Sequence, residues 1–204
     1  MQSDQPTTTP RHPHGLRVVP TPDADAGDLT IREDDELMQL AAGGLRSAFA
    51  ELTRRYASRV RGYCLKWNPS LGDDLAQEVF LKLWQARRDY QPRGKFSVYL
   101  FTIVRNGCRN ARRGWLRRPS FESMEAEAVE SGAPDGLDRV LERERVDRVQ
   151  RALPRLSPKL REAVLLRFAE EMSYSDMATI LNVPQATARG RVFHGLRRLQ
   201  EVLS

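Results

Sequence analysis

Arginines, whose side chains can bind anions, are concentrated in two segments of this sequence. One is along one side of residues 99–113, and the other is along residues 185–198. The arginine guanidinium group makes bidentate hydrogen bonds with phosphate and with guanine edges in the major groove. The first segment, here called the cationic strip, comprises Arg105, Asn106, Arg109, Asn110, Arg112 and Arg113. Almost no acid is interleaved there, so the strip repels itself unless something anionic lies on it. A solvated charged face is the simpler alternative, but the lack of acids favours nucleic-acid binding.

A surface of different chemistry is expected at residues 73–85. Apolar residues at three- and four-residue spacing predict one helical face in the core, formed by Leu75, Val79, Phe80, Leu83 and Trp84. The opposite side, here called the acidic face, carries Asp73, Asp74, Gln77, Glu78, Leu81 and Gln85. Because the protein is otherwise strongly basic, this concentration of acids and amides indicates a protein-binding surface.

The charge of the whole chain agrees with a polyanionic partner. The chain has 204 residues and a formal net charge of +6, and 29 of its 33 cationic residues are arginine. Residues 31–118 carry +9 and residues 148–204 carry +5, whereas residues 119–147 carry −6. Two basic blocks separated by an acidic one favour nucleic acid as the partner.

The sequence gives little indication of an enzyme, a metal-binding protein or a membrane protein. Cys64 and Cys108 lie outside any CxxC pair, and we expect two buried thiols rather than a redox pair. His12 and His14, in a proline-rich segment, are expected to be solvated. We find no nucleophile with a base, no metal-ligand cluster and no glycine-rich phosphate loop, so neither catalysis nor a cofactor is expected. The lack of a bilayer-length apolar run or a signal peptide predicts a cytoplasmic protein.

The elements that position these surfaces are all expected to be helices, in two small domains. Residues 1–30 are proline-rich and poor in large apolar groups, which predicts a disordered tail. Residues 31–118 form the predicted first domain, a helical bundle, and residues 139–204 form the second, a helix-turn-helix. The acids and breakers of residues 119–138 predict a flexible linker.

Four helices are expected in the first domain. Asp34 or Asp35 can cap a short first helix, and the second covers about residues 45–67. The third begins at the acidic face, whose two aspartates complement the helix dipole. Ser97 can cap a long fourth helix, which carries the cationic strip.

The second domain shows the start and stop signals of a helix-turn-helix. Ser157 and Pro158 open a supporting helix, and Ser173 and Asp176 have the spacing of a capping box. Asn182 suits the left-handed conformation in which helices commonly end. A final helix over residues 185–203 follows. Residues expected in this core are Leu160, Val164, Leu165, Phe168, Ala188, Val192, Leu196 and Leu199.

The first turns of the final helix carry polar groups suited to base edges, namely Gln185, Thr187, Arg189 and Arg191. In this motif the second helix enters the major groove with its N-terminal residues. The basic side continues along the phosphates through His194, Arg197 and Arg198. Helical hairpins of this kind also occur in proteins that do not bind DNA, but the many arginines favour DNA binding.

Three motifs together resemble a known family. They are DDLAQEVFLKLW, RGKFSVYLFTIVRNGCRNARR and LSPKLREAVLLRFAEEMSYSDMATILNVPQATARGRVFHGLRRL. In this order they resemble a bacterial RNA polymerase sigma factor of the sigma-70 family, in its extracytoplasmic-function group. The resemblance covers about residues 33–203 and includes both domains of that family, called region 2 and region 4.

The resemblance implies three sets of site residues. The set that docks on core polymerase is Asp74, Gln77, Glu78 and Leu81. The set that melts and contacts the minus-ten promoter element, where a base leaves the stack, is Arg93, Lys95, Phe96, Tyr99, Arg105, Asn106, Arg109, Arg112 and Arg113. The set for the minus-thirty-five element is Gln185, Thr187, Arg189, Arg191, His194, Arg197 and Arg198. Promoter elements two DNA turns apart are separated by roughly 70 Å, which the linker and the widths of the domains can span.

By this resemblance the chain is a dissociable polymerase subunit that confers promoter recognition, without catalysis, and an anti-sigma protein is its expected inhibitor. Tyr99 stands where the family often has tryptophan, Asn110 where aspartate is frequent, and Asn182 where glycine is common. The alternative is a helix-turn-helix regulator that acts alone through residues 137–204. Such a regulator would not need the acidic face.

Overall fold

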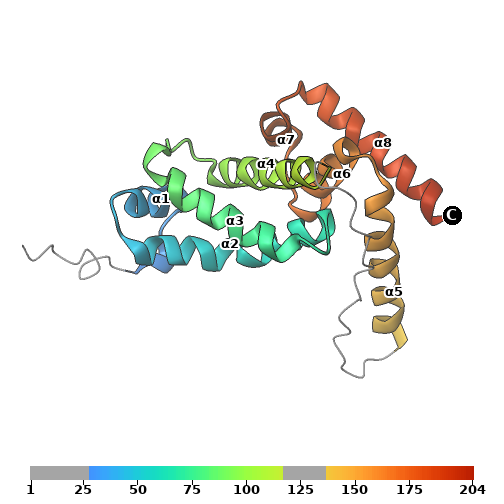
Figure 1. The fold of residues 1–204 in the computed structure, drawn as a ribbon, viewed down its shortest axis with the longest axis horizontal. Coiled ribbons are helices and arrows are strands. Elements are labelled where there is room, and N and C mark those ends of the chain that lie inside the picture. Colours follow the sequence, from blue (N-terminus) through green and yellow to red (C-terminus); the bar gives the residue numbers. More distant parts are fainter. Residues whose placement is uncertain (1–27, 117–136) are drawn as a thin grey trace, which may run out of the picture.

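The computed structural model of the chain describes residues 28–116 and 137–204, with side chains over residues 28–111 and 144–204. All regular elements in these two ranges are helical, which confirms the predicted all-α class. Most of the predicted tail and linker lie outside the described residues. Figure 1 shows α2, α3 and α4 running lengthwise beside one another, with the later helices gathered at the far end of α4.

The first domain contains four α-helices and two short 3-10 turns. In order they are η1 (Leu29–Ile31), α1 (Asp34–Ala42), α2 (Arg46–Trp67), α3 (Gly72–Gln85), η2 (Ala86–Asp89) and α4 (Phe96–Leu116). The predicted core face of α3 is confirmed in Leu75, Val79 and Leu83, which are buried, whereas the predicted Phe80 and Trp84 are half-buried. Gly72 opens α3 directly against α2, where a Cβ atom would lie 2.7 Å from the Cα of Leu65.

The two aspartates at the start of α1 do not cap it, contrary to the prediction. Glu33 holds the N-cap position without a side-chain hydrogen bond. The carboxylate of Asp34 instead accepts hydrogen bonds from Arg55, at 2.8 Å, and from the hydroxyl of Tyr56. Both donors lie on α2. The acid therefore ties α1 to its neighbour.

The start of α4 also differs from the prediction, because the helix begins at Phe96 and Ser97 lies inside its first turn. Phe96 is 3% exposed. Its ring makes edge contacts with Tyr56 and Tyr90, at centroid distances of 5.3 and 6.0 Å. Burial of this aromatic ring places the beginning of α4 in the core.

The second domain contains the predicted helix-turn-helix behind its supporting helices. Its elements are α5 (Leu137–Ala152), η3 (Leu153–Arg155), α6 (Pro158–Val164), a π-helical turn η4 (Leu165–Ala169), α7 (Tyr174–Leu181) and α8 (Gln185–Leu203). The hydroxyl of Ser173 accepts a bond from the backbone N–H of Asp176, as predicted. Asn182 adopts the predicted left-handed conformation, with φ 50° and ψ 57°. Ser157 precedes α6 but makes no side-chain cap.

Two residues predicted in the core of the second domain are exposed. Phe168 is 57% exposed because the π-turn η4 changes the helical period there, and the backbone N–H of Glu170 bonds to the carbonyl of Leu165 five residues earlier. Leu196 is 42% exposed because the buried face of α8 runs through Gly195 instead. A Cβ atom at Gly195 would lie 2.5 Å from a methyl carbon of Val164. Hence α6 and α8 meet at the glycine.

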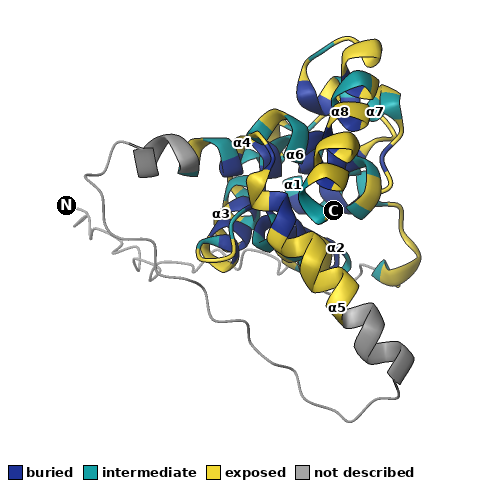
Figure 2. Ribbon diagram, turned by 90° about the vertical axis from the view of Figure 1, so that its right-hand side faces the viewer, coloured by how far each residue is buried: buried dark blue, intermediate teal, exposed yellow. Residues whose placement is uncertain are grey.

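The two domains pack directly against one another. Helix α7 lies on α4, and η3 and η4 lie against α2. Figure 2 shows buried residues gathered where these helices meet, whereas residues 144–151 of α5 are exposed. The surfaces of the first domain are therefore not all free in this arrangement.

Candidate nucleic-acid interface

The acidic face of α3 is fully presented to solvent. All six residues predicted for it are exposed, and Leu81 is an exposed apolar side chain among them, with 55% exposure. Within this face Glu78 pairs with Lys82 one turn later, at 2.5 Å. Asp73 pairs with Arg61 of α2, at 2.6 Å. A large apolar group surrounded by acids and amides is suited to a protein partner with basic and apolar groups.

The loop that precedes α4 is held by Asp35 of α1. This carboxylate accepts hydrogen bonds from the hydroxyl of Tyr90 and from the backbone N–H of Gly94. Burial, followed by the bond to Asp35, raises the pKa of Tyr90, so its hydroxyl remains a donor. Gly94 adopts φ 66°, a conformation that favours glycine. The loop thus has a defined backbone path.

A hollow of about 360 Å³ opens beside this loop. The rings of Tyr90 and Tyr99 lie 4.9 Å apart at its wall, and Arg93 and Lys95 border it. Thr179 of α7, in the second domain, lines the same hollow. Aromatic walls with cations at the rim suit a base that has left its stack.

The residues predicted for the minus-ten element differ in their exposure to solvent. Arg93, Lys95 and Asn106 are exposed, and Tyr99 and Arg109 are half-buried. The side chains of Arg112 and Arg113 lie outside the described residues. Phe96, in the core, supports the loop from beneath and does not reach the surface.

Arg105 was predicted on the open side of α4, but it is only 8% exposed. Its Nε lies 3.5 Å from a carboxylate oxygen of Glu162 on α6, and its Nη2 donates to the carbonyl of Leu181 at 3.3 Å. The Nε of Arg109 lies 3.5 Å from the other oxygen of Glu162. Burial raises the pKa of Glu162, although the two guanidinium groups oppose that shift. Two members of the cationic strip, Arg105 and Arg109, thus face a carboxyl group of the second domain.

The polar side of α8 is available, as predicted. Gln185, Thr187 and Arg189 are exposed on its first turns, and Arg191 is half-buried. The guanidinium carbon of Arg189 lies 5.2 Å from the centroid of the Tyr174 ring. Further along the helix are the exposed His194, Arg197 and Arg198.

The second domain also carries an apolar groove that was not predicted from the sequence. This groove, of about 520 Å³, lies between α5, α6 and α8. Val149, Phe168 and Leu196 line it, and each is at least 40% exposed. The groove could not be predicted from the sequence, because these three residues have the spacing of a buried helical face.

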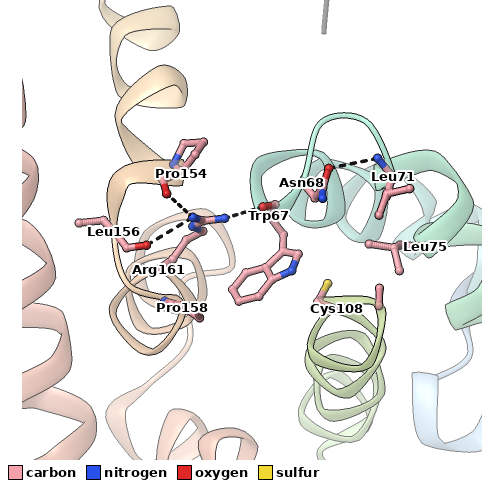
Figure 3. Close-up of a pocket in the computed structure, with 10 residues that line it drawn as sticks. Trp67, Asn68, Leu71, Leu75, Cys108, Pro154, Leu156, Pro158 and Arg161 are labelled. Atoms are coloured by element: carbon pink, nitrogen blue, oxygen red, sulfur yellow. Dashed lines mark hydrogen bonds between the residues drawn. The ribbon is translucent and has the colours of Figure 1, made fainter. Parts of the chain in front are cut away.

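A second hollow, of about 380 Å³, lies where the two domains join. Figure 3 shows Arg161 of α6 reaching across it to the carbonyl of Trp67, at 2.6 Å. The same guanidinium group lies over the Trp67 ring, at 5.2 Å from its centroid. This contact joins the end of α2 to α6 of the second domain.

Cys108 lines the same hollow, and both cysteines are free and buried. A hydrogen bond with the thiol of Cys64, together with burial, raises the pKa of Cys108. A thiol that stays protonated is a poor nucleophile. The geometry agrees with two structural thiols.

No helix in the described ranges is long and apolar enough to cross a membrane.

Comparison with known proteins identifies both domains. Residues 52–118 match the family model Sigma-70 region 2, and residues 147–199 match Sigma-70, region 4. The RNA polymerase sigma factor CarQ of Myxococcus xanthus is 34% identical over 81% of this chain and 95% of its own. The ECF RNA polymerase sigma-E factor of Escherichia coli is 31% identical over 78% of this chain and 88% of its own.

Among solved structures, the fold is similar to that of the sigma factor RpoE in complex with the anti-sigma factor NepR from Bartonella quintana. The TM-score is 0.62 at 25% identity, over 76% of this chain and 96% of that one.

Proposed function

Since this chain belongs to the sigma-70 family as an extracytoplasmic-function sigma factor, which binds core RNA polymerase and directs it to promoters, we propose how its surfaces divide that work. The acidic face docks on the polymerase. The loop at residues 91–95, with α4, binds the minus-ten element, and α8 binds the minus-thirty-five element. The observation that carries this assignment is that an acidic face on α3 and a cationic face on α8 are both exposed, on separate domains.

The docking assignment rests on the exposed Asp74, Gln77, Glu78 and Leu81. A variant that combines Gln77→Ala with Glu78→Arg should abolish binding to core polymerase and leave the fold intact, because both side chains point to solvent. Co-purification with core polymerase measures the first effect and circular dichroism the second.

Glu36→Arg is the matched control for this variant. Glu36 of α1 pairs with Arg32, which precedes the helix, at the same four-residue spacing, and its side chain has a similar exposure, 42% against 50% for Glu78. The control should bind core polymerase normally. Normal co-purification of the Gln77→Ala, Glu78→Arg variant would contradict the docking assignment.

We assign the unstacked base of the minus-ten element to the hollow beside the loop. Base stacking on an aromatic ring contributes about 1–3 kcal/mol, and Tyr90 and Tyr99 offer two rings there. Arg93 and Lys95 lie at the rim, where phosphates of the same strand can pair with them. Strand opening thus needs no catalytic group, and the protein acts by binding alone.

Run-off transcription with core polymerase and a library of promoters tests the function as a whole. The expected result is initiation at a defined set of promoters, whose shared sequences identify both elements. A regulator acting alone through its helix-turn-helix would bind DNA without directing core polymerase. The family membership and the exposed acidic face both argue against that alternative.

We also propose that the protein works in the cytoplasm and that an anti-sigma protein holds it inactive. The similar RpoE of Bartonella quintana was solved in complex with the anti-sigma factor NepR. The apolar groove between α5, α6 and α8 and the basic surfaces of both domains offer area for a protein partner.

A further inference from the structure

Three arginines of the second domain surround a small hollow between α5 and the C-terminal end of α8. The hollow has a volume of about 180 Å³. Its cationic wall consists of Arg148, Arg151 and Arg155, and the rest of its wall is formed by Ala152, Val202 and Leu203. None of the three arginines belongs to the sets expected at the promoter elements. The proposed function therefore leaves this hollow without a role.

Backbone carbonyl groups hold two of the three guanidinium groups in place. The Nη2 of Arg148 donates to the carbonyl of Leu203 at 2.9 Å, which ties α5 to the end of α8. The Nε of Arg151 donates to the carbonyl of Asp147, one turn earlier in the same helix, at 3.3 Å. A guanidinium group has five N–H donors, so each of these groups retains donors for a ligand. Side chains that are already held lose less conformational entropy when a ligand binds.

The charge of this arginine cluster is not neutralised by the protein. Among the side chains that the structure describes, no carboxylate pairs with Arg148, Arg151 or Arg155. The neighbouring acid on α8, Glu201, pairs instead with Arg197 and Arg198. Exposed cations on other surfaces do have acidic partners, as in the pairs Arg54–Glu51, Arg61–Asp73 and Lys82–Glu78. Three like charges around one hollow repel one another unless an anion lies between them.

The dimensions of the cluster indicate the kind of anion. With a rise of 1.5 Å per α-helical residue and about 2.0 Å per 3-10 residue, Arg148 and Arg155 are roughly 12 Å apart along the chain axis. A row of this length offers charge-assisted contacts to two or three successive phosphate groups. The hollow is smaller than the roughly 300–1,000 Å³ of pockets that enclose a whole drug-sized ligand. It therefore suits a chain of phosphates whose remaining groups stay outside.

We propose that this hollow binds a small molecule that carries two or more linked phosphate groups. Thr187 precedes Leu203 by 16 positions, which corresponds to about 24 Å along an α-helix. The ligand lies beyond the first turns of α8, so the site does not depend on the assignment of those turns to DNA. Because the arginines are on α5 and η3 and the opposite wall is on α8, a bound ligand stabilises the packing of these elements.

A titration with inorganic tripolyphosphate can locate the site in the full chain. Two-dimensional NMR of the ¹⁵N-labelled protein, at physiological ionic strength, follows each backbone amide group. The amide signals of residues 148–155 and 202–203 should shift at lower tripolyphosphate concentrations than those of residues 187–191. Sulfate serves as the control for simple ionic attraction, and it should require much higher concentrations because it offers a single tetrahedral group.

A variant that combines Arg151→Gln with Arg155→Gln tests the residues. Arg148 is retained in it, because its bond to Leu203 contributes to the packing of α5 on α8. The affinity for tripolyphosphate should fall at least about tenfold, since charge-assisted hydrogen bonds are lost. Circular dichroism should be unchanged, because both side chains are exposed. The matched control combines Arg46→Gln with Arg88→Gln, two exposed arginines of the first domain that have no assigned role, and it should bind tripolyphosphate as the wild type does.

Three results would overturn the proposal. Shifts that begin in residues 187–191, or that sulfate produces equally well, would show general attraction to cations. An equal loss of affinity in both double variants would show the same. Tighter binding of a short single-stranded oligonucleotide than of tripolyphosphate at residues 148–155 would identify a nucleic-acid backbone as the ligand instead. None of these measurements uses polymerase or a promoter, so their outcome is separate from that of the run-off transcription test.

Discussion

Gly72 offers a sharp test of how α2 and α3 are packed. It opens α3, the helix that carries the acidic face, and a Cβ atom there would lie 2.7 Å from the Cα and Cδ2 of Leu65 and 2.8 Å from its backbone nitrogen. Two of these three atoms belong to the backbone, so no change of side-chain rotamer can relieve the contact. Gly72→Ala must therefore shift one helix.

The expected cost follows from these distances. Carbon atoms pack best at about 3.5–4.0 Å, so α3 must move away from α2 by up to roughly 1 Å. Overpacking of this kind destabilises proteins by about 1–3 kcal/mol. Gly62, in the middle of α2, provides the comparison, since a Cβ atom there meets only the flexible end of Lys66, at 3.8 Å. Gly62→Ala should stabilise the domain by about 0.5–1 kcal/mol, through the helix propensity of alanine.

Tryptophan fluorescence in urea can measure this difference within the first domain. The chain has three tryptophans, all before residue 118, and Trp67 and Trp84 lie at the ends of α2 and α3. With a typical dependence of about 1–3 kcal/mol per molar urea, the midpoint of Gly72→Ala should fall by on the order of 1 M. The midpoint of Gly62→Ala should rise. A midpoint for Gly72→Ala at or above the wild-type value would refute the close approach of the two helices.

Two further predictions concern the promoter contact and the pH dependence of stability. Arg189→Ala should weaken promoter binding by about 1–3 kcal/mol, and it should do so through the upstream element. An equal loss in binding assays on a template without that element would count against the assignment. Hydrogen bonds from Arg54 and Arg55 lower the pKa of Glu51 to about 2, from 4.5, so its stabilising effect is present above pH 4.5 and is lost as the pH falls towards 2. Glu51→Gln should therefore have a lower thermal midpoint than the wild type at neutral pH. The difference between the two midpoints should disappear as the pH falls from 4.5 towards 2. A difference that persists at low pH would show that the charge of Glu51 is not its cause.

The sequence predicted those parts of the fold that depend on local periodicity. The core face of α3 and the turn at Asn182 follow from side-chain spacing and from one backbone conformation, and both were confirmed. The predicted burial of Phe168 was wrong, because a π-turn changes the helical period by one residue and no residue type indicates such a turn. The core of α8 follows Gly195 rather than Leu196 for a related reason. Close helix packing selects the glycine, and this depends on the partner helix.

The candidate site was predictable as a set of residues but not as a state of the molecule. Periodicity placed Arg105 on the polar side of α4, and it indicated that an anion should lie there. It could not show that Glu162, 57 positions later, is that anion in this arrangement. Contacts between distant segments depend on how the domains pack, and a linear pattern does not contain that information. The expected polymerase and promoter contacts remain predictions for the experiments above.

The anchoring of the loop by Asp35 has a consequence for how such a protein can diversify. Because Asp35 binds Tyr90 and the backbone of Gly94, it fixes both ends of the loop from a helix 55 positions earlier in the chain. Between those ends, Pro92 restricts its own φ and the conformation of Gln91, whereas the exposed side chain of Arg93 does not determine the backbone path. Arg93 can be exchanged without rebuilding the loop. A substitution at this position can thus change which chemical groups the loop binds without changing the backbone conformation of the loop.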